Sequence, residues 1–224
     1  MLKRFTVGIF LLAGLVTLGY AADENQNACK GDPNQWRQLF DGKDLNGWKH
    51  VGPGGDTVED GLIRTHGGMG LLYWTGGKIS NCIIRVVFKM RDENDNSGVF
   101  IRFPKLGSTD PANDWKLAVD RGYEIQIDDT GKNPDTNPPT FGDPLHVTGS
   151  VYTLAPASTV ASLPLGQWNA YEITARGNDI SVVLNGISVS SLQGGTRSTQ
   201  GYIGLQNHHA GSRVQFRNIR IKTL

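Results

Sequence analysis

Five polar side chains in three segments of this sequence could act together on a sugar. Arg102, Glu124, Gln126, Gln206 and His208 each alternate with apolar residues. Because successive side chains of a β-strand point to opposite faces, each segment presents one polar and one apolar face. A carboxylate, an imidazole, a guanidinium and two amides could bind hydroxyl groups and transfer protons. These three segments therefore predict a polar binding face.

Hydrolysis by a pair of carboxylates is poorly supported. Glu124 and Asp128 share one strand face, but four residues of strand span about 13 Å. The two carboxyl groups of a conventional glycosidase lie about 5–9.5 Å apart. Glu124 could pair with a carboxylate of another strand, such as Glu172, although nothing in the sequence requires it. The acidic strand motif of laminarinase-type enzymes is also missing.

Other common chemistries lack their sequence patterns. The chain contains no Gly-x-Ser-x-Gly, no His-Glu-x-x-His, no phosphate-binding loop and no dinucleotide-binding glycine motif. Its 22 Lys and Arg residues nearly balance 21 Asp and Glu residues, for a net charge of +1. Nucleic-acid binders usually carry a basic excess, so no nucleic-acid partner is expected.

The remaining aromatic and histidine residues divide into ligand candidates and structural candidates. Three tryptophans could stack on a sugar ring: Trp48, Trp74 and Trp115. Trp168 opens a strand and is expected in the core. Three histidines without metal-ligand spacing are expected at the surface: His50, His66 and His146.

The elements that must position these residues are strands. The 224 residues include 29 glycines, and apolar residues recur with a period of two. Strands are expected at 84–90, 97–103, 122–128, 171–175, 180–184, 201–206 and 214–221. Asn185-Gly186 predicts a hairpin, and the phase change within 214–221 predicts a β-bulge near Arg217-Asn218. Residues 129–149 are expected to form a long loop. The fold class is all-β, one domain built as a two-sheet antiparallel sandwich of jelly-roll type.

The N-terminal residues indicate export. Lys3 and Arg4 precede an apolar run, and Gly19-Tyr20-Ala21 has the small residues of a cleavage site, so residues 1–21 are a predicted signal peptide. Residues 22–34 would be an N-terminal extension and 35–224 the jelly-roll domain. We expect a periplasmic or extracellular protein with no membrane span after signal cleavage. Cys29 and Cys82 could form a disulfide there, but the sequence leaves this open.

Six motifs together resemble a known family, the 3-keto-disaccharide hydrolase domain, formerly a domain of unknown function. They follow in order over nearly the whole predicted mature chain: Leu39–Trp48, Asn96–Arg102, Gly122–Asp128, Thr148–Tyr152, Gly201–His208 and Val214–Ile221. The resemblance implies a concanavalin A-like jelly roll and an exported bacterial protein acting on oxidised sugars. A carbohydrate substrate is the expected partner, and a sugar 3-dehydrogenase could supply it.

The implied reaction needs one base rather than two carboxylates. The C2 proton of a 3-keto sugar is acidic, so its removal, elimination of the C1 substituent and addition of water would cleave the glycosidic bond. Glu124 or His208 would be the base and Arg102 would stabilise the enolate. Substrate binding is assigned to Gln126, Gln206, Asn96 and Trp74. No cofactor is predicted, although a divalent cation could replace the arginine. The alternatives are a non-catalytic carbohydrate-binding module and a cell-surface structural protein.

Overall fold

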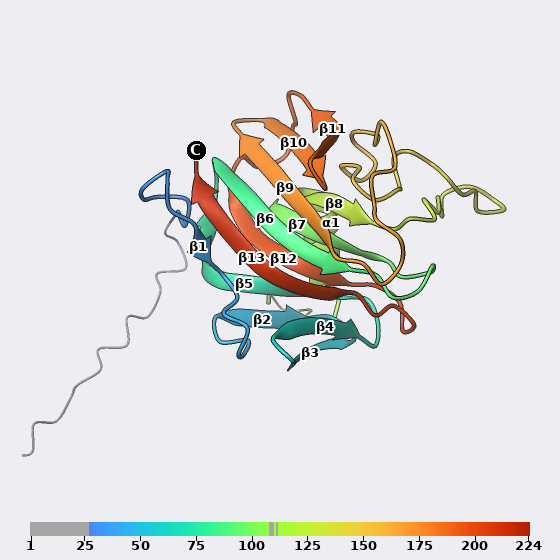
Figure 1. Ribbon diagram of the computed structural model, residues 1–224, viewed down its shortest axis with the longest axis horizontal. Helices are drawn as coiled ribbons and strands as arrows, with labels where there is room; N and C mark the ends of the chain where they lie inside the picture. Colours follow the sequence, from blue (N-terminus) through green and yellow to red (C-terminus); the bar gives the residue numbers. More distant parts are fainter. Residues whose placement is uncertain (1–26, 108–109, 111) are drawn as a thin grey trace, which may run out of the picture.

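The protein consists of two antiparallel β-sheets packed face to face. A computed structural model describes residues 27–107, 110 and 112–224. In Figure 1, strands of the larger sheet, among them β6, β9 and β13, lie in front of β7, β8 and β12 of the smaller one. The all-β jelly-roll sandwich expected from the sequence is confirmed. The predicted signal peptide, residues 1–21, lies outside the described residues.

The larger sheet has eight strands in the order β11-β10-β9-β6-β13-β4-β3, with β1 pairing with β13. Its strands are β1 (Arg37–Gln38), β3 (Gly55–Glu59), β4 (Leu62–His66), β6 (Cys82–Lys89), β9 (Asn169–Arg176), β10 (Asp179–Leu184), β11 (Ile187–Leu192) and β13 (Gln215–Thr223). The smaller sheet has five strands in the order β2-β5-β12-β7-β8. They are β2 (Trp48–Val51), β5 (Gly70–Ile79), β7 (Ser97–Phe103), β8 (Tyr123–Ile127) and β12 (Gly201–Asn207).

The core between the sheets follows directly from strand alternation. In β6, Ile84, Val86 and Phe88 are fully buried, whereas the residues between them are partly exposed. Ile125 of β8 and Leu205 of β12 contribute to the same cluster from the smaller sheet. Burial of these large apolar side chains contributes about 1.5–3 kcal/mol each. This core holds the two sheets together in a fixed arrangement, and so positions the outward-facing residues of both.

Two local predictions from the sequence are confirmed. Asn185 and Gly186 have φ angles of 53° and 84°, as a hairpin between β10 and β11 requires. In β13 the pairing with β6 shifts between Arg217 and Arg220, and Asn218 has φ 51°. This shift is the expected bulge, and it lets both halves of β13 bury their apolar residues.

A short helix, α1 (Asp114–Arg121), was not expected from the sequence. Eight residues give only two turns, too few for a clear helical period. The helix packs on the outer face of the five-stranded sheet, where Trp115, Leu117 and Val119 adjoin a second apolar cluster that includes Tyr73 and Phe100. Part of this outer face is therefore covered rather than solvated.

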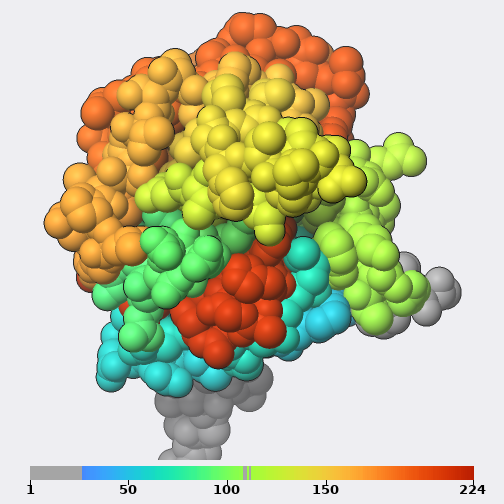
Figure 2. Space-filling model, turned by 90° about the vertical axis from the view of Figure 1, so that its right-hand side faces the viewer, coloured from blue at the N-terminus to red at the C-terminus, as the bar shows by residue number. Residues whose placement is uncertain are grey.

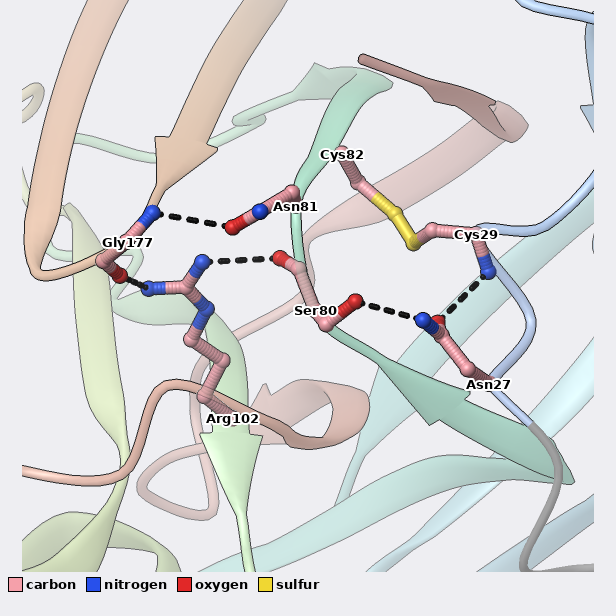
Figure 3. Close-up of a disulfide and its surroundings, with 7 residues drawn as sticks. All are labelled: Asn27, Cys29, Ser80, Asn81, Cys82, Arg102 and Gly177. Atoms are coloured by element: carbon pink, nitrogen blue, oxygen red, sulfur yellow. Dashed lines mark hydrogen bonds between the residues drawn. A yellow bond between two sulfur atoms is a disulfide. The ribbon is translucent and has the colours of Figure 1, made fainter.

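A disulfide joins Cys29 to Cys82 at the start of β6, with 5.7 Å between the Cα atoms. Figure 3 shows how it ties the N-terminal segment to the end of the larger sheet. The sequence left this pairing open. Closing a loop of 53 residues contributes about 4 kcal/mol in the chain-entropy account of disulfide stabilisation.

Candidate functional site

A cavity of about 350 Å³ opens on the outer face of the five-stranded sheet, beside α1. Its lining residues come from several separate segments: Met69, Asn96, Trp115, Val119, Glu124, Gln126, Lys132, Pro134, Tyr152, Gln206 and His208. In Figure 2 the red segment after β12 lies between the green segment before β7 and a cyan segment, below the yellow loop that follows β8. Five of the seven site residues predicted from the sequence line this cavity.

The register of the smaller sheet places three of these side chains together. Glu124 is paired with Phe100, and Gln126 with Gly98, so both point to the outer face. Gly204 of β12 pairs with Phe100 from the other side, and Gln206 lies two residues further along the same face. The predicted polar face therefore exists, and it is built from β7, β8 and β12.

Glu124 lies over a glycine that makes room for it. Its side chain is only 6% exposed. A Cβ atom added to Gly98 would lie 2.8 Å from Cγ and 2.9 Å from Cδ of Glu124, and closer still to Oε1. Any larger residue at position 98 would displace the carboxyl group. The sequence motif around residues 96–102 contained this glycine, but its purpose is visible only across the strand pair.

Burial gives Glu124 the properties of a base for use near neutral pH. Desolvation raises its pKa to about 8, and the positive charge of Arg197 opposes this only in part. With its amide nitrogen facing β7, Gln126 donates to the Ser97 carbonyl at 3.2 Å and to Glu124 Oε1 at 3.0 Å. Gln126 therefore orients the carboxyl group.

Two further amides present hydrogen-bond acceptors that are unused. Asn96 donates from Nδ2 to Asp128 Oδ2 at 3.0 Å, and its backbone is held by the Ser212 hydroxyl. Asn96 Oδ1 and Gln206 Oε1 are buried and have no hydrogen-bond partner among the described residues. Because a buried polar atom without a partner is costly, these oxygens are suited to accept hydrogen bonds from sugar hydroxyls.

His208 closes one side of the cavity as a neutral imidazole. Desolvation, then the neighbouring His209 and Lys132, lower its pKa to about 4. Its Nδ1 lies 3.2 Å from Nδ1 of His209. At neutral pH this ring carries no charge, so it can accept or pass on a proton but cannot supply a fixed positive charge.

Lys132 and Tyr152 line the cavity and were not selected from the sequence, whereas Trp115, which also lines it, was one of the three tryptophans expected to be able to stack on a sugar. Burial and then the nearby charge of Glu124 raise the pKa of Tyr152 to about 12, so its hydroxyl stays protonated. Lys132 and Tyr152 belong to the irregular segment between β8 and β9. The sequence indicated a long loop there, which is often functional, but loops carry no period from which to infer side-chain direction.

Arg102 does not reach the cavity, so the prediction of its catalytic role is wrong. Tyr202 pairs with Phe103 and Ile203 with Ile101, which makes Arg102 the extra residue of a bulge, with φ 59°. Its buried guanidinium donates to the carbonyls of Gly177 at 2.7 Å and Ser80 at 2.8 Å, as Figure 3 shows. Apolar and polar residue types do alternate from Ile101 to Arg102. The bulge nevertheless directs the Arg102 side chain toward the Gly177 turn, at the end of the sheets, and not onto the polar face.

Substitution of Arg102 by methionine should therefore lower stability without impairing catalysis. The change removes two hydrogen bonds that the fully buried guanidinium donates to the carbonyls of Gly177 and Ser80, and a hydrogen bond to a charged group contributes about 1.5–3 kcal/mol. We expect a reduced Tm in thermal unfolding and an unchanged kcat/KM measured well below that Tm. A large loss of kcat/KM in a fully folded Arg102→Met protein would contradict this placement.

The prediction that Trp74 binds the substrate is also wrong. It is 6% exposed and belongs to the core between the sheets, with the Arg37 guanidinium 4.9 Å from its ring centroid. Alternation along β5 turns Tyr73 outward and Trp74 inward. The tryptophan that lines the cavity is Trp115 of α1.

The expected positions of one histidine and one tryptophan outside the predicted site are also wrong. His146 is 3% exposed and stacks edge-on against Tyr152 rather than lying at the surface. Trp168 is only half-buried and lies on the outer face of the larger sheet, under the guanidinium of Arg217.

Among the described residues, no three His, Cys, Asp or Glu side chains converge so as to hold a metal ion. The divalent cation considered from the sequence stays a prediction. No helix within the described ranges has both the length and the apolar character needed to cross a bilayer.

A larger hollow, of about 730 Å³, lies on the other side of α1, between the helix and the segment around Arg197. None of the residues predicted for the site lines it. The smaller cavity is the better candidate because only there do a carboxyl group of raised pKa and unpaired amide oxygens face the same space.

Comparisons with known proteins identify the family to which this chain is similar. A family model described as 3-keto-alpha-glucoside-1,2-lyase-like domain matches residues 35–222. The chain is 27% identical to a 3-keto-disaccharide hydrolase of Bacteroides thetaiotaomicron over 238 aligned positions, covering 86% of this chain and 80% of the relative.

Solved structures extend the likeness to the fold. A proposed glycosyl hydrolase of Parabacteroides distasonis superposes with a TM-score of 0.70 at 25% identity, covering 84% of this chain and 94% of the other. A carbohydrate-binding module, CBM66, from Bacillus subtilis has a TM-score of 0.54 at 14% identity, covering 79% and 96%. That second likeness shows a common fold alone.

Proposed function

Because the chain belongs to the family of 3-keto-alpha-glucoside-1,2-lyase-like domains, we propose that it cleaves 3-keto-disaccharides by elimination followed by hydration. The word lyase in the family's description and the word hydrolase in the relative's name correspond to the two halves of this reaction. The observation that carries the proposal is Glu124, a single buried carboxyl group with a pKa of about 8 in a cavity lined by amides.

In the first step, the Glu124 carboxylate removes the proton from C2 of the 3-keto sugar. The electron pair of the C–H bond enters the enolate of the C3 ketone. A carboxylate with a raised pKa is a stronger base than an ordinary one, and bases are most effective when their pKa lies near the working pH. His208, with its pKa lowered to about 4, is the weaker base of the two, so we assign proton removal to Glu124.

The second step breaks the bond between C1 and the glycosidic oxygen. The enolate electrons form the C1–C2 double bond, and the departing oxygen takes a proton. Water then adds its oxygen to C1 and a proton to C2, so that the net reaction is hydrolysis. The Tyr152 hydroxyl, the His208 ring and the protonated Glu124 are the proton carriers that line the cavity.

Lys132 takes the role that the sequence assigned to Arg102. It is the lysine that lines this cavity, and it lies close enough to His208 to lower that residue's pKa. An ammonium group near the C3 oxygen stabilises the enolate as its charge develops. Asn96, Gln126 and Gln206 orient the ring, and the indole of Trp115 offers it an apolar wall.

Export to the periplasm or beyond remains part of the proposal. The disulfide between Cys29 and Cys82 supports it, because structural disulfides persist mainly in oxidising compartments. A sugar 3-dehydrogenase would supply the ketone, since ordinary disaccharides lack an acidic C2 proton.

The direct test is to incubate the purified protein with 3-keto-trehalose or 3-keto-sucrose over a series of pH values. We expect release of the unoxidised monosaccharide and a 3-keto hexose, with no cleavage of the parent disaccharides. Because the base must be ionised, kcat/KM should rise about tenfold per pH unit below the pKa of Glu124 and level off above about 8.

The same assay separates the alternative functions. Binding of unoxidised sugars without turnover of any 3-keto substrate would favour the non-catalytic carbohydrate-binding module. A rate that falls steadily between pH 6 and pH 8 would rule out Glu124 as the ionised base.

A further inference from the structure

The outer face of the eight-stranded sheet carries a concentrated row of positive charge. We use the name basic strip for the five cations that β6 and β13 carry on this face, together with two tryptophans. The residues of the basic strip are Arg85, Lys89, Arg217, Arg220, Lys222, Trp36 and Trp168. β6 and β13 run side by side across the front of Figure 1. The strip extends along β6 from Lys89 to Ile83, the residue that pairs with Lys222 of β13. This length of strand spans about 20 Å.

The bulge in β13 produces this concentration. Without it, Arg217 and Arg220 would point to opposite faces, because they are three residues apart. The register shift between them turns both side chains outward while Ile219 and Ile221 stay buried. The bulge therefore adds a second arginine to the same face.

Most of the positive charge of the basic strip is not balanced by neighbouring carboxylates. Arg85 and Arg220 lie directly opposite each other, an arrangement of like charges that destabilises a strand pair. Of the five cations, only Arg85 forms an ion pair within the described part of the chain, with Glu172, Nε to Oε2 at 2.6 Å. The whole chain is nearly neutral, so the excess is local.

The tryptophans hold the cations in place without neutralising them. Around Trp36, the charged groups of Arg85 and Arg220 lie 4.8 Å from the ring centroid and that of Lys222 lies 5.3 Å away. Trp168 holds Lys89 at 4.6 Å and Arg217 at 3.9 Å. The Nε donors of Arg217 and Arg220 have no acceptor among the described residues. Such stacking orients a guanidinium plane and leaves its edge for an anion.

A hollow of about 400 Å³ adjoins the Arg85–Arg220 pair. Besides these arginines and Glu172, its lining includes the apolar side chains of Val87, Ala170 and Val183. Guanidinium groups bind carboxylates through two parallel hydrogen bonds, and a small apolar floor suits the C–H face of a sugar ring. The geometry points to an acidic polysaccharide, a chain of carboxylate-bearing sugars, as the ligand of the basic strip.

This second carbohydrate site lies on the sheet opposite the catalytic cavity and is independent of the proposed reaction. It would hold the protein on an acidic glycan while the other face acts on small oxidised sugars. Binding along the strip should weaken steeply with salt, because several ionic contacts form at once.

The test uses affinity electrophoresis and calorimetry with polygalacturonate, with neutral dextran as the uncharged comparison. The full chain should bind polygalacturonate and not dextran. An R85Q/R220Q double variant should bind at least tenfold more weakly, whereas K116Q/R121Q, the same loss of two charges at exposed cations of α1 on the opposite sheet, should bind like the parent. An R85K/R220K variant, which keeps charge but loses the planar forks, should fall between them.

Turnover of 3-keto-disaccharides should be unchanged in R85Q/R220Q, which separates this proposal from the catalytic one. Unaltered binding of polygalacturonate by R85Q/R220Q, or equal weakening in K116Q/R121Q, would overturn the site. Equally tight binding of duplex DNA through the same two arginines would overturn the assignment to an acidic polysaccharide, because the strip would then respond to charge alone.

Discussion

A Glu124→Gln variant is expected to lose about 10³-fold in kcat/KM toward a 3-keto-disaccharide, within the range of about 10²–10⁴ for removal of a general base. Glutamine has the shape of glutamate and keeps the contact with Gln126, but it cannot take the C2 proton. Steady-state kinetics at pH 8 measures the effect. Retention of more than a tenth of the parent activity would remove Glu124 from the mechanism.

Stability measurements on the same variant provide its control. The pKa of Glu124 is raised in the folded state from 4.5 to about 8, so the unfolded chain releases this proton first as the pH rises. Its contribution to stability is fully present below about pH 4.5 and is lost as the pH rises through about 8. The glutamine variant does not undergo this loss. We therefore expect its Tm, relative to that of the parent protein, to increase between pH 5 and pH 9.

A Gly98→Ala variant is expected to lose about 10²-fold in kcat/KM while remaining folded. The added Cβ would overlap the Glu124 carboxyl group, and that group is the flexible end of a side chain, so it moves rather than the backbone. A displacement of about 1 Å in a catalytic group can cost this much activity. Kinetic assays together with thermal unfolding distinguish a displaced base from a damaged fold.

A double-mutant cycle shows whether Gly98 acts through Glu124. If it does, adding Gly98→Ala to Glu124→Gln should change kcat/KM by less than about threefold, because the base is already gone. Full multiplication of the two losses would contradict the steric explanation. A fall in Tm of the alanine variant as large as that of a core deletion would also argue against it.

The strands with strict alternation could be predicted well from the sequence. The predicted segment at 97–103 coincides with β7, the one at 122–128 is longer than β8 by one residue at each end, and the one at 180–184 is one residue shorter than β10. The hairpin at Asn185-Gly186 and the bulge in β13 were also visible, because each leaves a local signature in residue type or phase. The short helix α1 and the strands before residue 80 were not predicted, since their periods are too brief or interrupted by glycine.

Within the site, the regular strands were again the predictable part. Glu124, Gln126 and Gln206 follow undisturbed alternation, and the structure brings them to one cavity. Arg102 was misassigned because one inserted residue in the pairing of β7 with β12 reverses its direction. Trp74 was misassigned because the sequence does not show which face of β5 packs against the other sheet. Lys132 and Trp115 come from a loop and a short helix, where no period indicates direction.

By itself, the sequence determined the period-two pattern, the turn chemistry and the family motifs, because these depend on residues close together in the chain. Only the tertiary structure decided which polar side chains share a solvent-shielded cavity. That outcome depends on the register between β7, β8 and β12, on one bulge, and on the segments that cover the face. Desolvation inside this assembled cavity is what raises the pKa of Glu124, and no single segment contains that information.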